Sequence, residues 1–168
     1  PKLGDLALSN KIEAYNLPQG VISHMYRDIA AHNIGTITHV GLYTFADPRN
    51  GGGKLNDVTK EDLVKVVEIE GQERLLYKAF PINVVFLRAS YADEYGNCTV
   101  HREIGPIDVT AMAQACKNSG GRVIVQVEKI VQGGSLDPKL VAIPGIYVDS
   151  IVVGSIEDNE QCLGMPYD

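Results

Sequence analysis

The sequence predicts an α/β fold, built from a mainly parallel sheet with flanking helices and an appended β-hairpin. Three observations lead to this prediction. Stretches with the apolar spacing of helices alternate along the chain with β-rich runs. Breaks rich in Gly and Pro separate these stretches. The length of 168 residues, 45% of them hydrophobic, suits one globular domain with a buried core.

The first third of the chain is expected to form a βαβ unit behind the end of a short helix. Apolar residues recur at three- and four-residue steps after Val21 and mark one buried helix stripe: Ile22, Met25, Tyr26 and Ile29. The β-rich runs on either side supply the strands. The expected elements are a helix end at Leu3 to Ser9, a strand at Lys11 to Asn16, the helix from Val21 to Asn33, and a strand at Thr36 to Thr44.

The middle of the chain is expected to hold a surface loop, a hairpin and a buried strand. Asp47 to Asn56 is too rich in Gly, Pro and Asn for the interior of a helix or strand. Thr59 can cap a short helix. After it comes a hairpin, in which Val66 to Ile69 pairs with Arg74 to Tyr77. The nearly continuous apolar run from Ile82 to Ala89 predicts a strand that is covered on both faces.

The last part of the chain is expected to add a helix and two strands. Asp93 to Asn97 forms a turn, and Asp108 caps a helix that ends at Gly120-Gly121. Arg122 to Val127 is a buried strand, and Val148 to Val153 is the last strand. The helix should turn four residues inward: Val109, Met112, Ala113 and Cys116.

Composition and charge exclude several classes of protein. With 15 basic and 21 acidic residues and a net charge of -6, the surface would repel the phosphates of nucleic acids. No apolar run approaches the ~18–20 residues that cross a bilayer, so we expect a cytoplasmic protein with neither membrane nor nucleic-acid partners. Cys98, Cys116 and Cys162 are odd in number and far apart, which predicts reduced thiols. The four histidines lack ligand spacing, so no metal site is predicted.

The turn Pro18-Gln19-Gly20 is the first candidate for chemistry. It joins an expected strand to a helix start, where unpaired backbone N–H groups and the positive end of the helix dipole gather. The Gln19 carboxamide adds a neutral donor, so the turn can stabilise an oxyanion that forms during a reaction. The same pattern is also common at ordinary helix starts.

The glycine-rich stretch from Asn50 to Lys54 is the second candidate. Three glycines before a lysine indicate backbone amides that can cradle an anion. A Walker nucleotide loop is excluded because Leu55, not Ser or Thr, follows the lysine. A flexible connector is the competing explanation. Asp93-Glu94 lies in a turn, where solvated charge explains a carboxylate cluster.

Five longer motifs, in order along essentially the whole chain, point to a known family. They are KIEAYNLPQG (Lys11 to Gly20), GLYTFADPRNGGGKLN (Gly41 to Asn56), ADEYGN, KNSGG and PGIYVDSIVV. Together they resemble the family I coenzyme A transferases, and within that family the enzymes that act on acetate and propionate.

This resemblance implies a fold, an activity and an assembly. Such enzymes have two related α/β halves, use no metal and no permanently bound cofactor, and take coenzyme A as a substrate. They move it from a short-chain acyl-CoA, such as acetyl-CoA or propionyl-CoA, to a carboxylic acid by a ping-pong route through a glutamyl-CoA thioester. Residues 1–156 would then be part of the N-terminal domain, and residues 157–168 would begin the linker between domains. A homo-oligomer is expected, and the partner is either a second subunit or the remainder of the enzyme.

The resemblance also assigns site residues. Gln19 falls on the family's oxyanion-hole glutamine, in agreement with the role that its turn indicates. Further positions match segments near the substrate: Gly20, Gly41, Tyr43, Gly51 and Gly52. Relatives usually have glycine in place of Tyr43, so this phenol should crowd the pocket or require a changed backbone angle. The family's nucleophilic glutamate precedes Ser-Gly or Asn-Gly, which no glutamate here does, so the nucleophile is expected outside this chain.

Two other functions stay open at this point. The chain can be a noncatalytic subunit or module of a split transferase that binds acyl-CoA. It can also belong to an acyl-CoA hydrolase, in which water takes the place of the acceptor acid. Because donor groups without a nucleophile stabilise a transition state that never forms, these residues alone should show no turnover.

Overall fold

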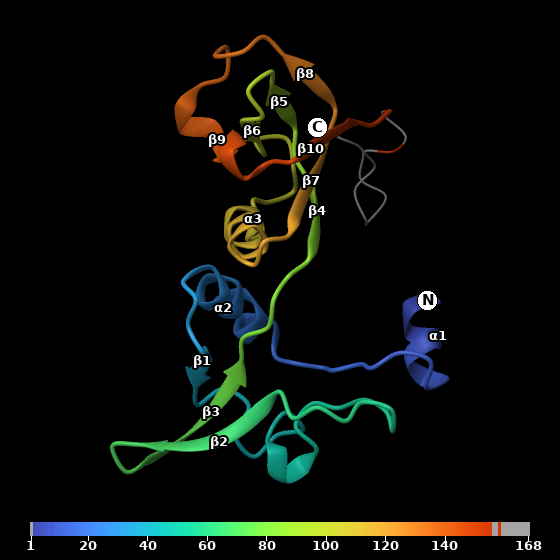
Figure 1. Ribbon diagram of the computed structural model, residues 1–168, viewed down its shortest axis with the longest axis vertical. Helices are drawn as coiled ribbons and strands as arrows, with labels where there is room; N and C mark the ends of the chain where they lie inside the picture. Colours follow the sequence, from blue (N-terminus) through green and yellow to red (C-terminus); the bar gives the residue numbers. More distant parts are fainter. Residues whose placement is uncertain (1, 156–157, 159–168) are drawn as a thin grey trace. The chain divides into compact units, whose positions relative to one another are not determined.

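The computed structural model describes residues 2–155 and residue 158, and the chain divides into two compact units, Pro1–Phe80 and Pro81–Asp168 (Figure 1). Both units combine helices with β-sheet, which confirms the predicted α/β class. No described helix has both the length and the apolar character needed to span a bilayer.

Two helices open unit 1. α1 spans Lys2–Leu8 and α2 spans Gln19–Ala30. The buried residues of α2 are Val21, Met25 and Ile29. Two residues of the predicted stripe, Met25 and Ile29, are therefore confirmed, whereas Ile22 and Tyr26 are only half-buried. Both predicted helices are confirmed, and the second begins at Gln19 itself, directly after Pro18.

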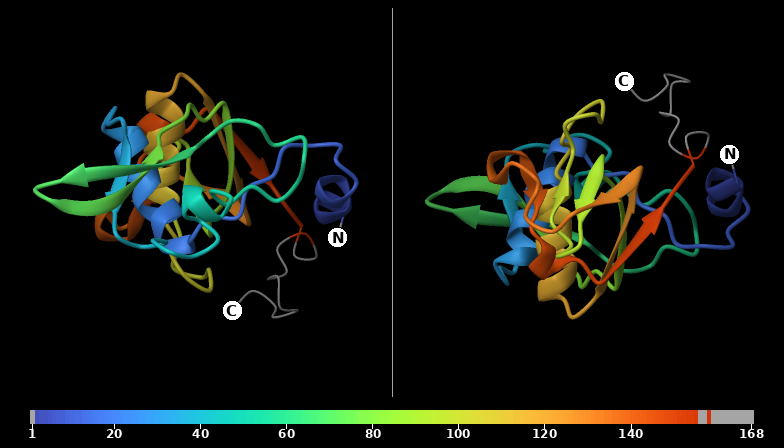
Figure 2. Two further views of the ribbon diagram at one scale, coloured as in Figure 1. Left: turned by 90° about the horizontal axis from the view of Figure 1, so that it is seen from below. Right: turned by 90° about the horizontal axis from the view of Figure 1, so that it is seen from above.

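The sheet of unit 1 has three antiparallel strands in the order β1-β3-β2. β2 (Val64–Ile69) and β3 (Gln72–Lys78) form the predicted hairpin, which both views of Figure 2 show as a long two-stranded ribbon. The sequence predicts the turn at Gly71-Gln72, but the turn lies one residue earlier, because Ile69 already pairs with Gln72. β1 (Gly35–Thr38) pairs with the other edge of β3. Leu75 and Tyr77 of β3 are fully buried, so the central strand carries the core of this sheet.

Three further details predicted for unit 1 are wrong. Lys11 to Asn16 is not a strand and makes a single isolated β-bridge. Only the start of Thr36 to Thr44 is a strand. No βαβ unit forms, because its predicted first strand is absent, and β1 pairs antiparallel with β3 instead. Residues 60–63 form no helix; instead, the buried Thr59 hydroxyl accepts a hydrogen bond from the Ala14 N–H at 2.7 Å. These short segments take the structure that their distant partners impose.

Unit 2 contains a parallel sheet with a helix packed on one face. The strand order is β10-β7-β4, with β4 at Val84–Arg88, β7 at Arg122–Val127 and β10 at Ser150–Val153. α3 (Val109–Asn118) packs against β4 and β7. These elements confirm the predicted helix and strands. Asp108 precedes α3 as predicted, but its side chain makes no capping hydrogen bond.

The opposite face of this sheet is open within the described chain. Leu87 of β4 is buried, whereas Val84 and Phe86 are 47% and 77% exposed. The prediction that this strand is covered on both faces is therefore wrong for the described residues.

A second, mixed sheet completes unit 2 in the order β8-β5-β6-β9. Its strands are β5 (Tyr91–Asp93), β6 (Cys98–Thr99), β8 (Lys129–Val131) and β9 (Val141–Ile143). The fully described 3-10 helices are η1 (Pro48–Asn50) in unit 1, and η2 (Pro138–Leu140) and η3 (Gly145–Tyr147) in unit 2. Cys98 and Cys116 are buried free thiols. Cys162 and most of residues 157–168 lie outside the described residues.

Candidate active site

Gln19 occupies the first position of α2, and its side chain is exposed. The carbonyl of Pro18 accepts hydrogen bonds from the N–H groups of Val21 and Ile22, at 2.9 and 3.1 Å. Neither the N–H groups of Gln19 and Gly20 nor the Gln19 carboxamide is bonded to another described residue. The helix start therefore presents several neutral donors to solvent, which is the set that an oxyanion site requires.

The chain that leads into Gln19 is held by the glycine-rich loop. The Asn16 N–H donates to the Gly53 carbonyl at 2.7 Å, and the Leu55 N–H donates to the Ala14 carbonyl at 2.9 Å. These two hydrogen bonds flank the isolated bridge described above. The residues just before the Pro18-Gln19-Gly20 turn thus pair with the end of the glycine-rich loop. The last paired residue, Asn16, lies three positions before Gln19.

A buried carboxylate, that of Asp47, organises this loop. Its oxygens accept hydrogen bonds from the Tyr43 N–H at 2.9 Å and from the Arg49 N–H at 3.0 Å. The Arg49 guanidinium adds two more, at 2.9 and 2.8 Å. The guanidinium holds the pKa of Asp47 well below its ordinary value, although burial by itself would raise it. Asp47 is therefore ionised at neutral pH and acts as the fixed centre of the loop.

Tyr43 is held from two sides. Its backbone lies in the left-handed region, with a φ of 63°. Of the two consequences expected for a tyrosine at this position, a crowded pocket or a changed backbone angle, the structure contains an unusual backbone angle. The ring is 72% exposed. Its hydroxyl donates to Glu73 at 3.2 Å, and the guanidinium carbon of Arg49 lies 5.0 Å from the ring centre. The exposed ring thus makes contacts with Glu73 and Arg49 at the surface of the loop.

The predicted glycines lie in different surroundings. At Gly41, a Cβ would lie 2.2 Å from the buried Tyr77 hydroxyl, so packing requires glycine there. Gly52 is buried, and a Cβ would be in ordinary contact with Pro48, at 3.7 Å. Gly51 is exposed, with open space where a Cβ would lie. The substrate-binding roles assigned to these glycines, to Gly20 and to Tyr43 stay predictions.

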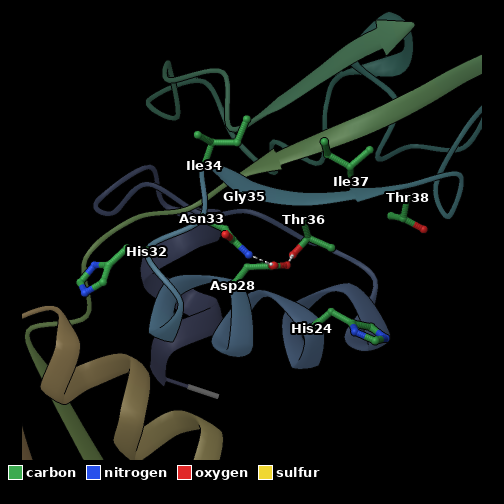
Figure 3. A pocket seen from close by; sticks show the side chains of 9 residues that line it. All are labelled: His24, Asp28, His32, Asn33, Ile34, Gly35, Thr36, Ile37 and Thr38. Atoms are coloured by element: carbon green, nitrogen blue, oxygen red, sulfur yellow. Dashed lines mark hydrogen bonds between the residues drawn. The ribbon is translucent and has the colours of Figure 1, made fainter. Parts of the chain in front are cut away.

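A separate pocket lies between α2 and β1 (Figure 3). Its volume is about 700 Å³. Asp28 lies at its centre and accepts hydrogen bonds from the Asn33 amide at 2.9 Å and the Thr36 hydroxyl at 2.6 Å. His24 and His32 lie at opposite ends of it. Gln19 does not line this pocket. Within the described chain, no three His, Cys, Asp or Glu side chains are grouped as metal ligands would be.

The ADEYGN turn of unit 2 has a structural role in the described chain. The buried Asp93 carboxylate accepts hydrogen bonds from the N–H groups of Tyr95 and Asn97, at 3.0 and 2.9 Å. The next residue, Glu94, accepts one from the Gly133 N–H at 2.9 Å. Both carboxylates therefore fix turns.

Sequence reasoning missed two residues of the loop, Asp47 and Gly53. Asp47 caps η1, and the pattern Asp-Pro-Arg carries the signal, because Pro suits the first position of a helical turn and Asp the position before it. Gly53 belongs to the glycine run, but nothing local separates it from its neighbours. Its role comes from a contact with a distant segment.

Comparison with known proteins identifies the family. The family model for coenzyme A transferase matches residues 1–154. An acetate CoA-transferase, YdiF, from Escherichia coli O157:H7 is 49% identical over 153 residues, which cover 91% of this chain and 29% of the relative. A caffeate CoA-transferase from Acetobacterium woodii is 51% identical over 161 residues, 95% of this chain and 30% of the relative. The chain thus spans about a third of the length of these curated relatives.

Solved structures agree with these matches. An acyl-CoA transferase (YdiF) of E. coli O157:H7, as a thioester complex with CoA, has a TM-score of 0.91 and 46% identity, and the match covers 100% of this chain and 33% of that one. Glutaconate coenzyme A-transferase from Acidaminococcus fermentans shares the fold, with a TM-score of 0.75 at 17% identity over 99% of this chain and 54% of that one. The extent of these matches shows that the chain belongs to the coenzyme A transferase family.

Proposed function

We propose that this chain is a segment of an enzyme that moves coenzyme A between a short-chain acyl-CoA, such as acetyl-CoA or propionyl-CoA, and a carboxylic acid. Gln19 is the oxyanion donor of that enzyme. The observation that carries the proposal is the exposed Gln19 at the start of α2, beside backbone N–H groups without partners among the described residues. The similarity to acetate and caffeate CoA-transferases supports the activity.

The proposed chemistry is covalent catalysis at a thioester. A glutamate carboxylate, supplied from outside these residues, attacks the acyl carbonyl and expels the CoA thiolate, which leaves an acyl-glutamyl anhydride. The thiolate then attacks the glutamyl carbonyl and releases the donor acid, so that a glutamyl-CoA thioester forms. The acceptor carboxylate reverses the same steps. Each attack places negative charge on a former carbonyl oxygen, which is the charge that fixed neutral donors stabilise.

The described residues have two tasks in this scheme. The Gln19 carboxamide and the backbone N–H groups of Gln19 and Gly20 donate to the oxyanion, and the positive end of the α2 dipole adds to their effect. The loop residues Gly41, Tyr43, Gly51 and Gly52 form part of the substrate wall. Coenzyme A is a substrate in this proposal, and the scheme routes no step through a metal. We place the enzyme in the cytoplasm as a homo-oligomer.

Substituting Gln19 in the full-length enzyme tests the proposal. Gln19→Ala should lower kcat by ~10²-fold in the transfer of CoA from acetyl-CoA to propionate, with KM nearly unchanged, because the lost interaction exists only in the transition state. The exposed Gln132 of unit 2 provides the matched control Gln132→Ala, which should keep the wild-type rate. Melting temperatures of both variants should equal that of the wild type. A wild-type kcat for Gln19→Ala would remove this residue from the mechanism.

The same assay separates transfer from hydrolysis. In a transferase, propionyl-CoA forms and loss of acetyl-CoA depends on added propionate. If acetyl-CoA disappears equally fast without the acid, the acceptor is water and the enzyme is a hydrolase. The purified 168-residue chain should show neither activity, since none of its glutamates precedes Ser-Gly or Asn-Gly and the proposed nucleophile is supplied from outside it.

A split transferase is the second candidate, and one observation favours it. One of the subunits of a 3-oxoadipate CoA-transferase from Pseudomonas putida is 32% identical over 154 residues, which cover 90% of this chain and 57% of that relative. Relatives with separate subunits therefore exist. The intact mass of the purified enzyme distinguishes the two arrangements. A second co-purifying chain that carries the glutamate indicates a split enzyme, whereas one chain several times longer indicates a single polypeptide.

A further inference from the structure

We propose that Gly53 is a positioning residue for Gln19. Only glycine at position 53 leaves room for the segment that leads into α2, and this segment determines where Gln19 lies. The inference rests on the proposed function, in which Gln19 is the oxyanion donor. It adds a residue that acts through the backbone and that does not itself touch the substrate.

The first observation is the close approach of two backbones. Gly53 is buried, and a Cβ built on it would lie 2.6 Å from the Asn16 carbonyl oxygen and 2.9 Å from Cδ2 of Leu17. Separations under 3 Å between such atoms require one of them to move. The nearer atom is main chain, which cannot rotate away as a flexible side chain can. A methyl group at residue 53 must therefore push the backbone at Asn16.

The second observation is how little freedom lies between that contact and Gln19. Asn16 is fixed to Gly53 by the 2.7 Å hydrogen bond, and Ala14 is fixed to Thr59 and Leu55 by bonds of 2.7 and 2.9 Å. Only two residues, Leu17 and Pro18, separate Asn16 from Gln19. The proline ring holds φ at −58°. A shift at Asn16 is thus passed on to the start of α2.

The third observation concerns the Gln19 side chain. No hydrogen bond joins its carboxamide to another described residue, and the side chain is exposed. No other described residue therefore holds the carboxamide in place, and the backbone alone fixes the point from which this side chain extends. Catalysis is sensitive to such placement, since a misplacement of about 1 Å can cost ~10²-fold in rate.

Gly71 offers a matched control for the backbone strain that any substitution at Gly53 introduces. The two glycines have nearly equal φ values, +76° for Gly53 and +72° for Gly71. Gly71 lies in the turn of the β2–β3 hairpin, and a Cβ there would meet nothing within 4 Å. Alanine therefore suffers the same left-handed strain at both positions, but only at Gly53 does it push on another segment.

The test uses the full-length enzyme with acetyl-CoA and propionate. Gly53→Ala should lower kcat roughly tenfold or more, but by no more than Gln19→Ala does, while KM for acetyl-CoA stays close to the wild type. Gly71→Ala should keep the wild-type kcat. The decisive measurement is the double variant. If Gly53 acts by placing the donors at the start of α2, Gly53→Ala costs a clearly smaller factor in the Gln19→Ala background than in the wild type.

The outcomes are distinguishable. A wild-type kcat for Gly53→Ala, an equal loss in Gly71→Ala, or losses that multiply in the double variant would overturn the positioning role while Gln19 keeps its own. No effect of Gln19→Ala would overturn the proposed function, and the inference with it. If Gly53→Ala gives no cooperative melt, Thr59→Val takes its place and is combined with Gln19→Ala in the same comparison of kcat. This substitution loosens the segment before α2, because it removes the hydroxyl that accepts from the Ala14 N–H without adding bulk. Multiplying losses there would again overturn the inference.

Discussion

Removing the Asp47 carboxylate should open the loop from Gly41 to Lys54 without unfolding unit 1. Asp47→Ala deprives the N–H groups of Tyr43 and Arg49 of a buried, charged acceptor. Hydrogen bonds to charged groups contribute ~1.5–3 kcal/mol each, so the two backbone bonds at the low end of this range give about 3 kcal/mol. We add nothing for the guanidinium, which is 44% exposed and regains water when the carboxylate is gone. The loop should lose about 3 kcal/mol of stability against local opening.

Hydrogen exchange measures this loss directly. The N–H groups of Gly52 and Gly53 donate to the carbonyls of Asp47 and Phe45, both at 2.9 Å, and these backbone bonds survive the substitution. Their exchange therefore reports opening of the loop. A loss of about 3 kcal/mol corresponds to roughly 100-fold faster exchange in peptides that cover residues 50–54. Asp62→Ala is the control, because Asp62 is 72% exposed and its pair with Lys54 is screened by solvent.

The stabilisation by the Asp47 carboxylate should disappear at low pH. The folded-state pKa of Asp47 is lowered, so the stability it contributes is fully present above its unfolded pKa of about 3.9 and is lost as the pH falls through the folded value. The difference between wild type and Asp47→Ala should thus be constant from about pH 5 to 7 and shrink below about pH 4. Equal exchange of wild type and variant at neutral pH would refute the reasoning.

Two further predictions concern the thiols and Tyr43. Burial raises the pKa of Cys98 to about 12 and that of Cys116 above its ordinary value, so neither should react with iodoacetamide at about pH 8 until denaturant is added. Peptide mapping checks this, and labelling of either thiol in the native protein would contradict it. Tyr43→Gly should raise kcat/KM for acids larger than propionate relative to acetate, because it removes a fixed ring from the proposed substrate wall. Competition between acids measures the ratio, and an unchanged ratio would exclude Tyr43 from the wall.

Local patterns in the sequence were sufficient for the elements whose residues interact with near neighbours. The apolar spacing after Val21 predicts α2, because residues three and four apart share one face of a helix, and Met25 and Ile29 of the predicted stripe are buried. The β2–β3 hairpin closes across two residues, and the run of β7 is apolar enough to be buried. The PQG turn similarly marked Gln19, since a helix start is defined by its own few residues.

Only the tertiary structure decided how distant segments pair. The sequence predicts a strand at Lys11 to Asn16 and a parallel partner for β1, whereas the folded chain forms a single bridge and an antiparallel pair with β3. Asp47 and Gly53 owe their importance to groups that folding brings to them: the N–H of Tyr43 for one and the carbonyl of Asn16 for the other. β-pairing and close backbone contacts join residues far apart in the chain, so their partners are fixed by packing and cannot be read from local spacing.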